Sequence, residues 1–230
     1  MRIEVCDATV AYDGIPTLHQ TSLTIEPGTI VLCTGPTGAG KTTLLRLLYA
    51  DLVPTTGSVL IDGVQTSAMS PAQRREMRLQ QGIVQQNCLL VSDYTVFENV
   101  LMPYAVRGVS KDEAHRACLD LLADLNISYV RNKYPHQLSG GERHLVALAR
   151  ALSSKPDVLI ADEPTGTLDD ATSAQVAHML HMLHTRHHAG MTMVISTHSQ
   201  NFVNAFPTAT VCSVVDGTVR MTPPAQGAEI

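Results

Sequence analysis

Several features that would place the chain in other protein classes are missing from its sequence. The five cysteines are scattered and form no C-x-x-C motif, which argues against a zinc site or a disulfide framework and suits a reducing cytosol. The net charge is −5 and no basic block stands out, so nucleic acid is not expected as the main partner.

Long apolar runs are also missing. No stretch approaches the roughly 18 uninterrupted apolar residues that a membrane helix needs. No secretory signal peptide is visible, because Met1 leads straight into strand-like alternation. We therefore expect any membrane association to come through a partner. The 230 residues, 44% of them hydrophobic, fit one sizeable α/β domain, or one domain with a subdomain.

A glycine-rich segment at residues 35–42 organises the chain. It reads Gly-Pro-Thr-Gly-Ala-Gly-Lys-Thr and fits G-x-x-x-x-G-K-[ST], the phosphate-binding loop (P-loop) of nucleotidases. A short apolar run at residues 29–34 precedes it, as a buried parallel strand should, and helical spacing follows. The pattern predicts a helix N-terminus and backbone N–H groups around a phosphate chain. Lys41 would reach the β/γ-phosphates, and the Thr42 hydroxyl would bind Mg²⁺.

A second strong pattern is residues 157–164, in which an apolar run at residues 158–161 ends in Asp162 and Glu163, the acidic pair, and a proline. It indicates a buried strand with charge at its carboxyl end, where open α/β sheets bind ligands. We expect Asp162 to hold Mg²⁺ through its water shell and Glu163 to act as general base on the attacking water. His198 follows a later strand, residues 192–196, within reach of a γ-phosphate.

Residues 138–142, Leu-Ser-Gly-Gly-Glu, form a signature segment. Two glycines at the mouth of a helix make a second anion-binding N-terminus. An ordinary helix start with Ser139 as N-cap explains them equally well. Helical patterns from about residue 87 to 154, with a capping box at Thr95, predict a helical insertion between two strands of the core.

Elsewhere in the chain, the spacing of apolar residues predicts strands at residues 2–10, 17–25 and 82–86 and a helix at 71–80. Asp-Gly pairs predict hairpin turns at residues 62–63 and 216–217. A further helix is expected from about residue 170 to 188. It carries a series of histidines. We interpret them as a polar, solvated face of the helix and not as a metal site. The series is His178, His181, His184, His187 and His188.

Six features follow one another along the chain in an order that resembles the ABC ATPases. They are the P-loop, Gln86, the signature segment, the acidic pair, residues 167–169 and His198. The resemblance covers residues 2 to about 221, and the signature segment makes it far more specific than a P-loop alone. Residues 95–100 and 163–169 are similar to the FtsE, LolD and MacB branch of the family. Residues 37–49 are most similar to its FtsE members.

The resemblance implies a P-loop NTPase fold of the α/β class, the ABC-type nucleotide-binding domain, over residues 1–222. A RecA-like core and an antiparallel β subdomain would take residues 1–86 and 155–222. The helical subdomain would take residues 87–154, and residues 223–230 would be a loose C-terminal tail.

The resemblance also implies an ATP-hydrolysing enzyme that uses ATP and Mg²⁺. Lys41, Glu163 and His198 would be catalytic, with His198 holding the γ-phosphate and orienting Glu163, and Thr42, Gln86 and Asp162 would surround Mg²⁺. Tyr12 would stack on adenine, and Asp169 would belong to a loop that passes information between two sites. The implied nucleotide-binding residues are Tyr12, Gly35, Pro36, Thr37, Gly38, Ala39, Gly40, Lys41, Thr42, Thr43, Gln86, Ser139, Gly140, Gly141 and Asp169.

The implied partners are a second copy of the chain and an FtsX-like integral membrane subunit. Ser139 and Gly141 would contact the γ-phosphate of ATP held by the second copy, and the membrane subunit would dock near residues 87–103. The chain would then be cytoplasmic, peripheral on the inner face of the cell membrane, and would act in cell division and control of cell-wall hydrolysis.

A LolD- or MacB-type lipoprotein-release or efflux ATPase is an alternative function within the same branch. A soluble ABC protein acting on nucleic acid or ribosomes is disfavoured, since the chain has one cassette and no coiled-coil or zinc insertion. A scaffold that hardly hydrolyses is disfavoured by Glu163 and His198, and a small GTPase by the missing aspartate of N-K-x-D at residues 132–135.

Some positions depart from the family pattern. Arg143, His144 and Leu145 stand where the branch usually has two glutamines and an arginine. Thr167 replaces a common asparagine, and Ser199 replaces a common aspartate. These departures bear on the dimer interface and the ATPase rate, while every position expected to contact phosphate or Mg²⁺ is intact.

Overall fold

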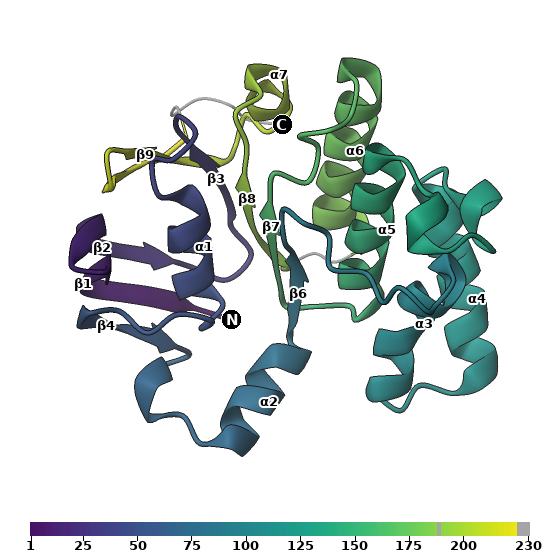
Figure 1. Ribbon diagram of the computed structural model, residues 1–230, viewed down its shortest axis with the longest axis horizontal. Coiled ribbons are helices and arrows are strands. Elements are labelled where there is room, and N and C mark those ends of the chain that lie inside the picture. The colour runs from purple at the N-terminus through teal and green to yellow at the C-terminus, as the bar shows by residue number, and fades with distance from the viewer. Residues whose placement is uncertain (188–189, 225–230) are drawn as a thin grey trace.

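The computed structural model describes residues 1–187 and 190–224, in which two β-sheets and a set of helices form the molecule (Figure 1). The smaller sheet is antiparallel, with the strand order β2-β1-β4-β5. Its strands are β1 (Ile3–Tyr12), β2 (Ile15–Ile25), β4 (Thr56–Ile61) and β5 (Val64–Gln65).

The larger sheet has the strand order β10-β9-β3-β8-β7-β6. Its neighbouring strands are parallel except for the edge strand β10, which pairs antiparallel with β9. The strands are β3 (Ile30–Thr34), β6 (Gln81–Val84), β7 (Val158–Asp162), β8 (Thr192–Ser196), β9 (Thr210–Val215) and β10 (Thr218–Thr222). The carboxyl ends of β3, β7 and β8 therefore meet at one edge of the sheet.

Helix starts follow the sequence closely, because several are fixed by capping boxes. Ser70, Thr95 and Ser139 each cap a helix and exchange hydrogen bonds with the glutamine or glutamate three residues later. The expected capping box at Thr95 and N-cap at Ser139 are thus confirmed. The helices are α1 (Lys41–Leu48), α2 (Pro71–Leu79), α3 (Val96–Val106), α4 (Lys111–Asp124), α5 (Gly140–Ser153), α6 (Asp170–Met182) and α7 (Gln200–Asn204).

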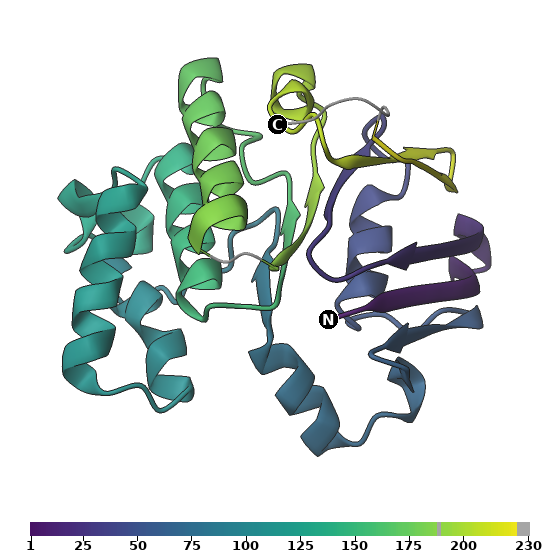
Figure 2. The same cartoon turned by 180° about the vertical axis from the view of Figure 1, so that it is seen from behind.

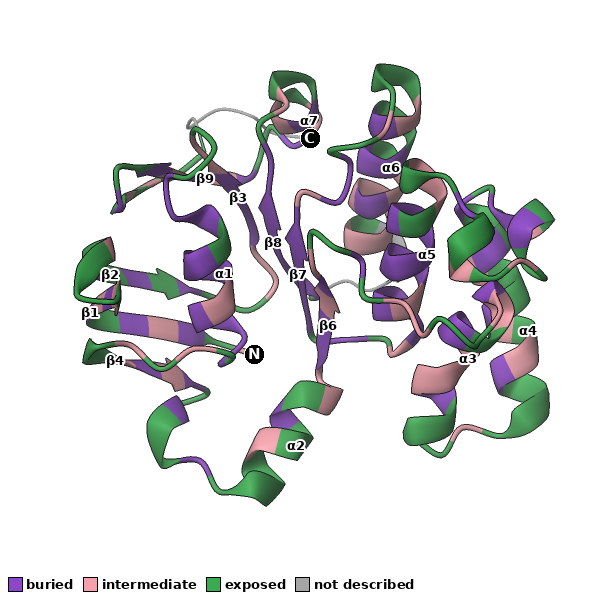
Figure 3. Ribbon diagram, viewed as in Figure 1, coloured by how far each residue is buried: buried purple, intermediate pink, exposed green. Residues whose placement is uncertain are grey.

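Helix α1 lies between the two sheets (Figures 1 and 2). Its leucines, among them Leu44 and Leu47, are buried with Val10 and Val59 of the small sheet and Ile160 of the large one. Helices α5 and α6 cover the opposite face of the large sheet, and strands β7 and β8 are buried along their whole length (Figure 3). Burial on both faces explains why these strands read as continuous apolar runs.

Hairpin turns at residues 13–14, 62–63 and 216–217 are all Asp-Gly, with positive φ at both residues. That backbone suits the two-residue turn that joins twisted antiparallel strands. The turns expected at residues 62–63 and 216–217 are confirmed. The strands predicted at residues 2–10 and 17–25 extend to Tyr12 and back to Ile15, on either side of the turn at residues 13–14.

Two other boundaries differ from expectation. Strand β6 ends at Val84, so Gln85 and Gln86 follow the strand instead of ending it. Helix α6 ends at Met182 and continues as a π-helical turn, Leu183–His187, while residue 188 lies outside the described residues. The expected loose tail at 223–230 also lies mostly outside them, and the division into subdomains at residues 86 and 154 stays a prediction.

The five cysteines are free thiols. Cys33 of β3 and Cys212 of β9 face each other in register across neighbouring strands, and both are buried. A hydrogen bond with Cys212, together with burial, raises the pKa of the Cys33 thiol well above its usual range. Burial also raises the pKa of Cys118 to about 12. Cys6 is exposed.

Candidate active site

The P-loop connects β3 to α1 at the edge where the parallel strands end. Gly35 has a positive φ, and a Cβ there would collide with the carbonyl oxygen of Val214, so only glycine fits. The buried Lys41 ammonium donates to the carbonyl oxygens of Gly35 and Pro36 at 2.9 and 3.0 Å. The loop thus curls around its own lysine and holds the charge at the helix N-terminus.

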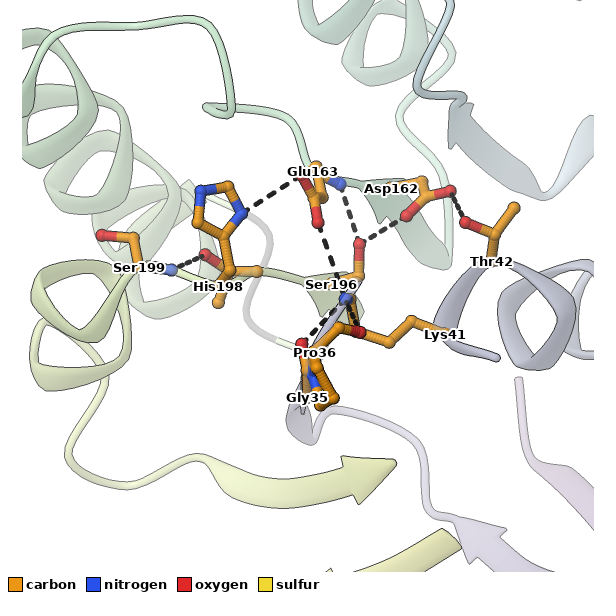
Figure 4. A network of polar contacts seen from close by, with 10 residues as sticks. Gly35, Pro36, Lys41, Thr42, Asp162, Glu163, Ser196, His198 and Ser199 are labelled. Carbon is orange, nitrogen blue, oxygen red and sulfur yellow. Dashed lines mark hydrogen bonds and ion pairs between the residues drawn. The ribbon is translucent and has the colours of Figure 1, made fainter. Parts of the chain in front are cut away.

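Three strand ends and α1 are joined by a hydrogen-bonded network around the acidic pair (Figure 4). Thr42 Oγ1 donates to Asp162 Oδ2 at 2.7 Å. Ser196 Oγ donates to Asp162 Oδ1 at 2.6 Å and accepts the backbone N–H of Glu163 at 2.8 Å. Ser196 is fully buried and stands beside Asp162 in the register of β7 and β8, so one hydroxyl fixes both acidic residues.

Glu163 leaves β7 in a left-handed backbone conformation, with a φ of +49°. Such a conformation is uncommon outside glycine, asparagine and aspartate and costs energy that neighbouring contacts must offset. Its carboxylate lies between two cationic or ionisable groups. Glu163 Oε1 is 3.7 Å from Lys41 Nζ, and Glu163 Oε2 is 3.2 Å from His198 Nδ1. The structure therefore brings together all three residues expected to be catalytic.

A cavity of about 220 Å³ opens beside this network. It is lined by Thr17, Thr37, Gly38, Gly40, Lys41, Thr42, Thr43, Gln86, Asp162 and Glu163. Gln86 reaches this lining although it is outside β6. Tyr12 is 42% exposed at the end of β1, next to the strand that supplies Thr17. Thr17 is a lining residue that the sequence pattern did not reveal.

The lining suits a triphosphate and a hard cation. A lysine ammonium, a helix N-terminus and a glycine-rich backbone are the groups that bind phosphate. The Thr42 hydroxyl and the Asp162 carboxylate converge within hydrogen-bonding distance, and oxygen donors of this kind are preferred by Mg²⁺. The residues present thus fit both ligands.

The signature segment is not part of this cavity, whose lining in the described residues includes none of Ser139, Gly140 and Gly141. Ser139 and Gly140 are exposed at the start of α5. The backbone N–H of Ser139 lowers the pKa of the Glu142 carboxyl, so this cap weakens as the pH falls through that lowered pKa. Asp169 caps α6 by accepting the backbone N–H and the hydroxyl of Thr172.

The comparisons with known proteins bear on this geometry. The protein-family model described as "ABC transporter" matches residues 18–166, from β2 through the P-loop and signature segment to the acidic pair. The chain belongs to the ABC transporter family. The expected fold, an ABC-type nucleotide-binding domain, and the expected enzyme class, an ATP hydrolase, are confirmed.

Two kinds of curated relative are similarly close to this ABC cassette. The cell division ATP-binding protein FtsE of Bacillus subtilis (strain 168) is 35% identical over 218 residues, 94% of each chain. The methionine import ATP-binding protein MetN 1 of Pseudomonas putida is 38% identical over 195 residues, 84% of this chain. The chain spans 58% of that MetN's length. The comparisons therefore establish the family without separating these two kinds of ATPase.

Solved structures give the same family. The dimeric post-hydrolysis state of the ATP-binding cassette MJ0796, bound to ADP and Pi, has a TM-score of 0.88 and 30% identity, covering 96% of this chain and 98% of that one. CbiO1 of Clostridium perfringens, part of the ABC transporter complex cbiONQ, has a TM-score of 0.80 and 27% identity, covering 96% and 87%.

The histidine series that starts on α6 is described only in part. In the described part of the chain no group of three or more His, Cys, Asp or Glu side chains is placed to hold a metal ion. His184 Nε2 lies 2.9 Å from the carbonyl oxygen of Gly28, and His181 packs edge-on against Phe206. The side chains of His187 and His188 lie outside the described residues.

Among the helices of residues 1–187 and 190–224, none has the length and apolarity to cross a bilayer.

Ser196 gives a first testable prediction. Ser196→Ala should lower the turnover number for ATP about fivefold to thirtyfold, because Asp162 loses a donor and the Glu163 N–H is left without an acceptor, at a cost of about 1–2 kcal/mol. The KM for ATP should change little. Steady-state kinetics with Ser153→Ala as control, a buried serine bonded only to its own helix, would check this. Unchanged turnover would contradict a bracing role for Ser196.

Proposed function

We propose that the chain is the Mg²⁺-dependent ATPase subunit of a membrane ABC complex, and that it works as a head-to-tail pair around two ATP molecules. The observation that carries the proposal is the convergence of Lys41, Thr42, the acidic pair and His198 at one edge of the parallel sheet. The signature segment lies outside that cavity, as expected if it completes the site of a second copy.

In this proposal each residue of the site has a defined task. Lys41 and the P-loop backbone hold the β- and γ-phosphates, and phosphoryl transfer then depends mainly on positioning and charge neutralisation. Glu163 accepts a proton from the attacking water, and His198, 3.2 Å from its carboxylate, orients it. Thr42, Asp162 and Gln86 would hold Mg²⁺, which when bound neutralises charge on the phosphate oxygens.

The pair would form because each ATP offers phosphate contacts to both chains, and hydrolysis removes them. ATP thereby shifts the population between open and closed pairs. Ser139 and Gly140 are exposed and free to meet a phosphate held by the second copy. The similar cassette MJ0796 is dimeric in its solved structures, which supports pairing of two copies here.

We further propose that the complex is of the FtsE type, with an FtsX-like membrane subunit, and acts in cell division. The match to FtsE along nearly the whole of both chains supports this choice. Similarity to MetN favours methionine import as a second candidate. The membrane subunit would dock near residues 87–103, which at Met102 and Pro103 border a groove between α2, β6, α3 and α5. The groove is lined in part by Arg78, Ile83, Met102, Pro103, Val106, Arg107 and Arg150.

Ser139→Arg tests the two-copy site. A long cationic side chain at this exposed position should block closure on the second copy's ATP, so ATP-dependent pairing should be lost and hydrolysis should fall at least about tenfold. Gel filtration with ATP and steady-state hydrolysis would measure both effects. Ser110→Arg is the matched control, since it removes an equivalent N-cap serine from α4. Normal pairing and turnover by the Ser139→Arg protein would refute the proposal.

The identity of the membrane subunit is tested by purifying the chain with its native membranes and sequencing the bound integral protein. An FtsX-like subunit supports the cell-division assignment. A methionine permease, or a lipoprotein-release or efflux permease, would replace it and leave the ATPase proposal standing.

A further inference from the structure

A buried histidine joins the signature helix to the loop that follows the acidic pair. His144 lies in the second turn of α5 and is 6% exposed. Its Nδ1 atom is 2.9 Å from Thr167 Oγ1 and 3.0 Å from the carbonyl oxygen of Gly140. His144 and Thr167 are two of the positions at which this chain departs from the family pattern, so two departures contact each other.

The contact with Gly140 favours one tautomer of this histidine. The Gly140 carbonyl oxygen can only accept a hydrogen bond, so the proton is assigned to Nδ1. The Thr167 hydroxyl then accepts from the same N–H. The contact therefore needs a hydroxyl at residue 167 and a donor at the position of the His144 Nδ1 atom.

Packing brings the loop, residues 165–169, directly onto the first turn of α5. A Cβ at Gly141 would lie 2.6 Å from Leu168 Cδ2, and one at Gly140 would lie 3.6 Å from the side chain of Thr167. The two glycines of the signature segment therefore have two effects. They expose the backbone at the start of α5, and their missing side chains leave room for the loop. Leu168 and Thr167 occupy that room.

The other end of the loop is tied to the proposed general base. The Gly166 N–H donates to the carbonyl oxygen of Glu163 at 3.1 Å, and the Leu168 N–H donates to that of Thr165 at 3.0 Å. Asp169 ends the loop by capping α6. A short, hydrogen-bonded segment thus runs from Glu163 to His144.

We propose that His144 and Thr167 are positioning residues that hold the signature segment at a fixed place relative to Glu163 of the same chain. The inference rests on the proposed function, in which Glu163 acts on one ATP while the signature segment contacts the other. A displacement of about 1 Å can cost about a hundredfold in rate. A fixed link lets closure on one ATP align the base at the other.

Hydrogen exchange on the nucleotide-free chain tests the link without any ATPase activity. Thr167→Val removes the hydroxyl at nearly constant volume and should raise exchange about twofold to tenfold at residues 140–144 and 165–168, the factor that one ordinary hydrogen bond supplies. Amides of β3 and β8 should not change. Thr167→Ser keeps the hydroxyl and should preserve most of the protection. Equal exchange in the Val and Ser variants would overturn the link.

ATP-dependent pairing tests its role. In a Glu163→Gln background, Thr167→Val and His144→Phe should each weaken pairing about twofold to tenfold. The double variant should pair about as well as whichever single variant pairs more weakly, because both changes remove the same contact. His144→Asn, which returns a side-chain nitrogen near the Nδ1 position, should recover part of the loss. Losses that multiply in the double variant would overturn the positioning role.

The two readouts separate this inference from the proposed function. If the parent protein does not pair on ATP, the proposed function fails and the positioning role fails with it, while exchange still reports on the link. If the parent pairs and the variants pair equally well, the positioning role alone fails. Thermal unfolding of each variant shows whether a loss merely follows reduced stability.

Discussion

Glu163→Gln protein should bind ATP and remain in the ATP-bound pair, but should hydrolyse ATP about 10²–10⁴-fold more slowly than the wild type, the range that one general base contributes. The amide keeps the size and one oxygen of the carboxylate but cannot accept a proton from water. The left-handed backbone at residue 163 and the bond from its N–H to Ser196 do not involve the side chain and should persist.

Single-turnover hydrolysis, gel filtration with ATP and thermal unfolding would together check this result. Glu76→Gln, a change at an exposed glutamate on α2, is the matched control and should hydrolyse ATP like the wild type. Equal turnover by the Glu163→Gln and wild-type proteins would eliminate Glu163 as the base. Loss of ATP binding would instead give its carboxylate a role in holding the nucleotide.

Lys41→Met should reduce ATP affinity about a hundredfold or more and leave hydrolysis too slow to measure easily. Each hydrogen bond to a charged group is worth about 1.5–3 kcal/mol, and in the proposed function Lys41 gives such bonds to two phosphates. The chain should still fold, because methionine fills a similar volume and no buried carboxylate depends on Lys41 alone. Glu163 keeps His198 as a neighbour at 3.2 Å.

Equilibrium binding of a fluorescent ATP analogue would measure the affinity, and circular dichroism would confirm folding. Lys111→Met removes an exposed lysine at the start of α4 and is the matched control. A Lys41→Met protein that binds ATP within threefold of the control would contradict the assignment of Lys41 to the phosphates.

Much of the fold could be predicted because its signals are local. The capping boxes at Thr95 and Ser139 and the Asp-Gly turns at residues 62–63 and 216–217 each involve only a few consecutive residues. The P-loop and the end of β7 were equally visible, since each combines a buried apolar run with polar residues at its carboxyl end.

Contacts between distant segments could not be predicted in the same way. Ser196 ends an apolar strand and reads as an ordinary strand residue, yet parallel pairing of β7 and β8 places it beside Asp162. His144 and Thr167 are 23 residues apart, and only the packing of the loop on α5 brings them together. Thr17 reaches the cavity because β2 packs closely against the P-loop at Gly40. Such partners depend on register and packing, which one sequence does not encode at short range.

Alkylation of the cysteine pair, Cys33 of β3 and Cys212 of β9, should report on the packing at the centre of the large sheet. A thiolate is the reactive form, and Cys33 is held as a protonated thiol beside the buried Cys212. Cys6 should be alkylated at once, whereas Cys33 and Cys212 should be alkylated only when β3 and β9 separate. Since β3 leads into the P-loop, ATP should slow the alkylation of Cys33 and Cys212, and mass spectrometry of the alkylated peptides would measure how often β3 and β9 separate.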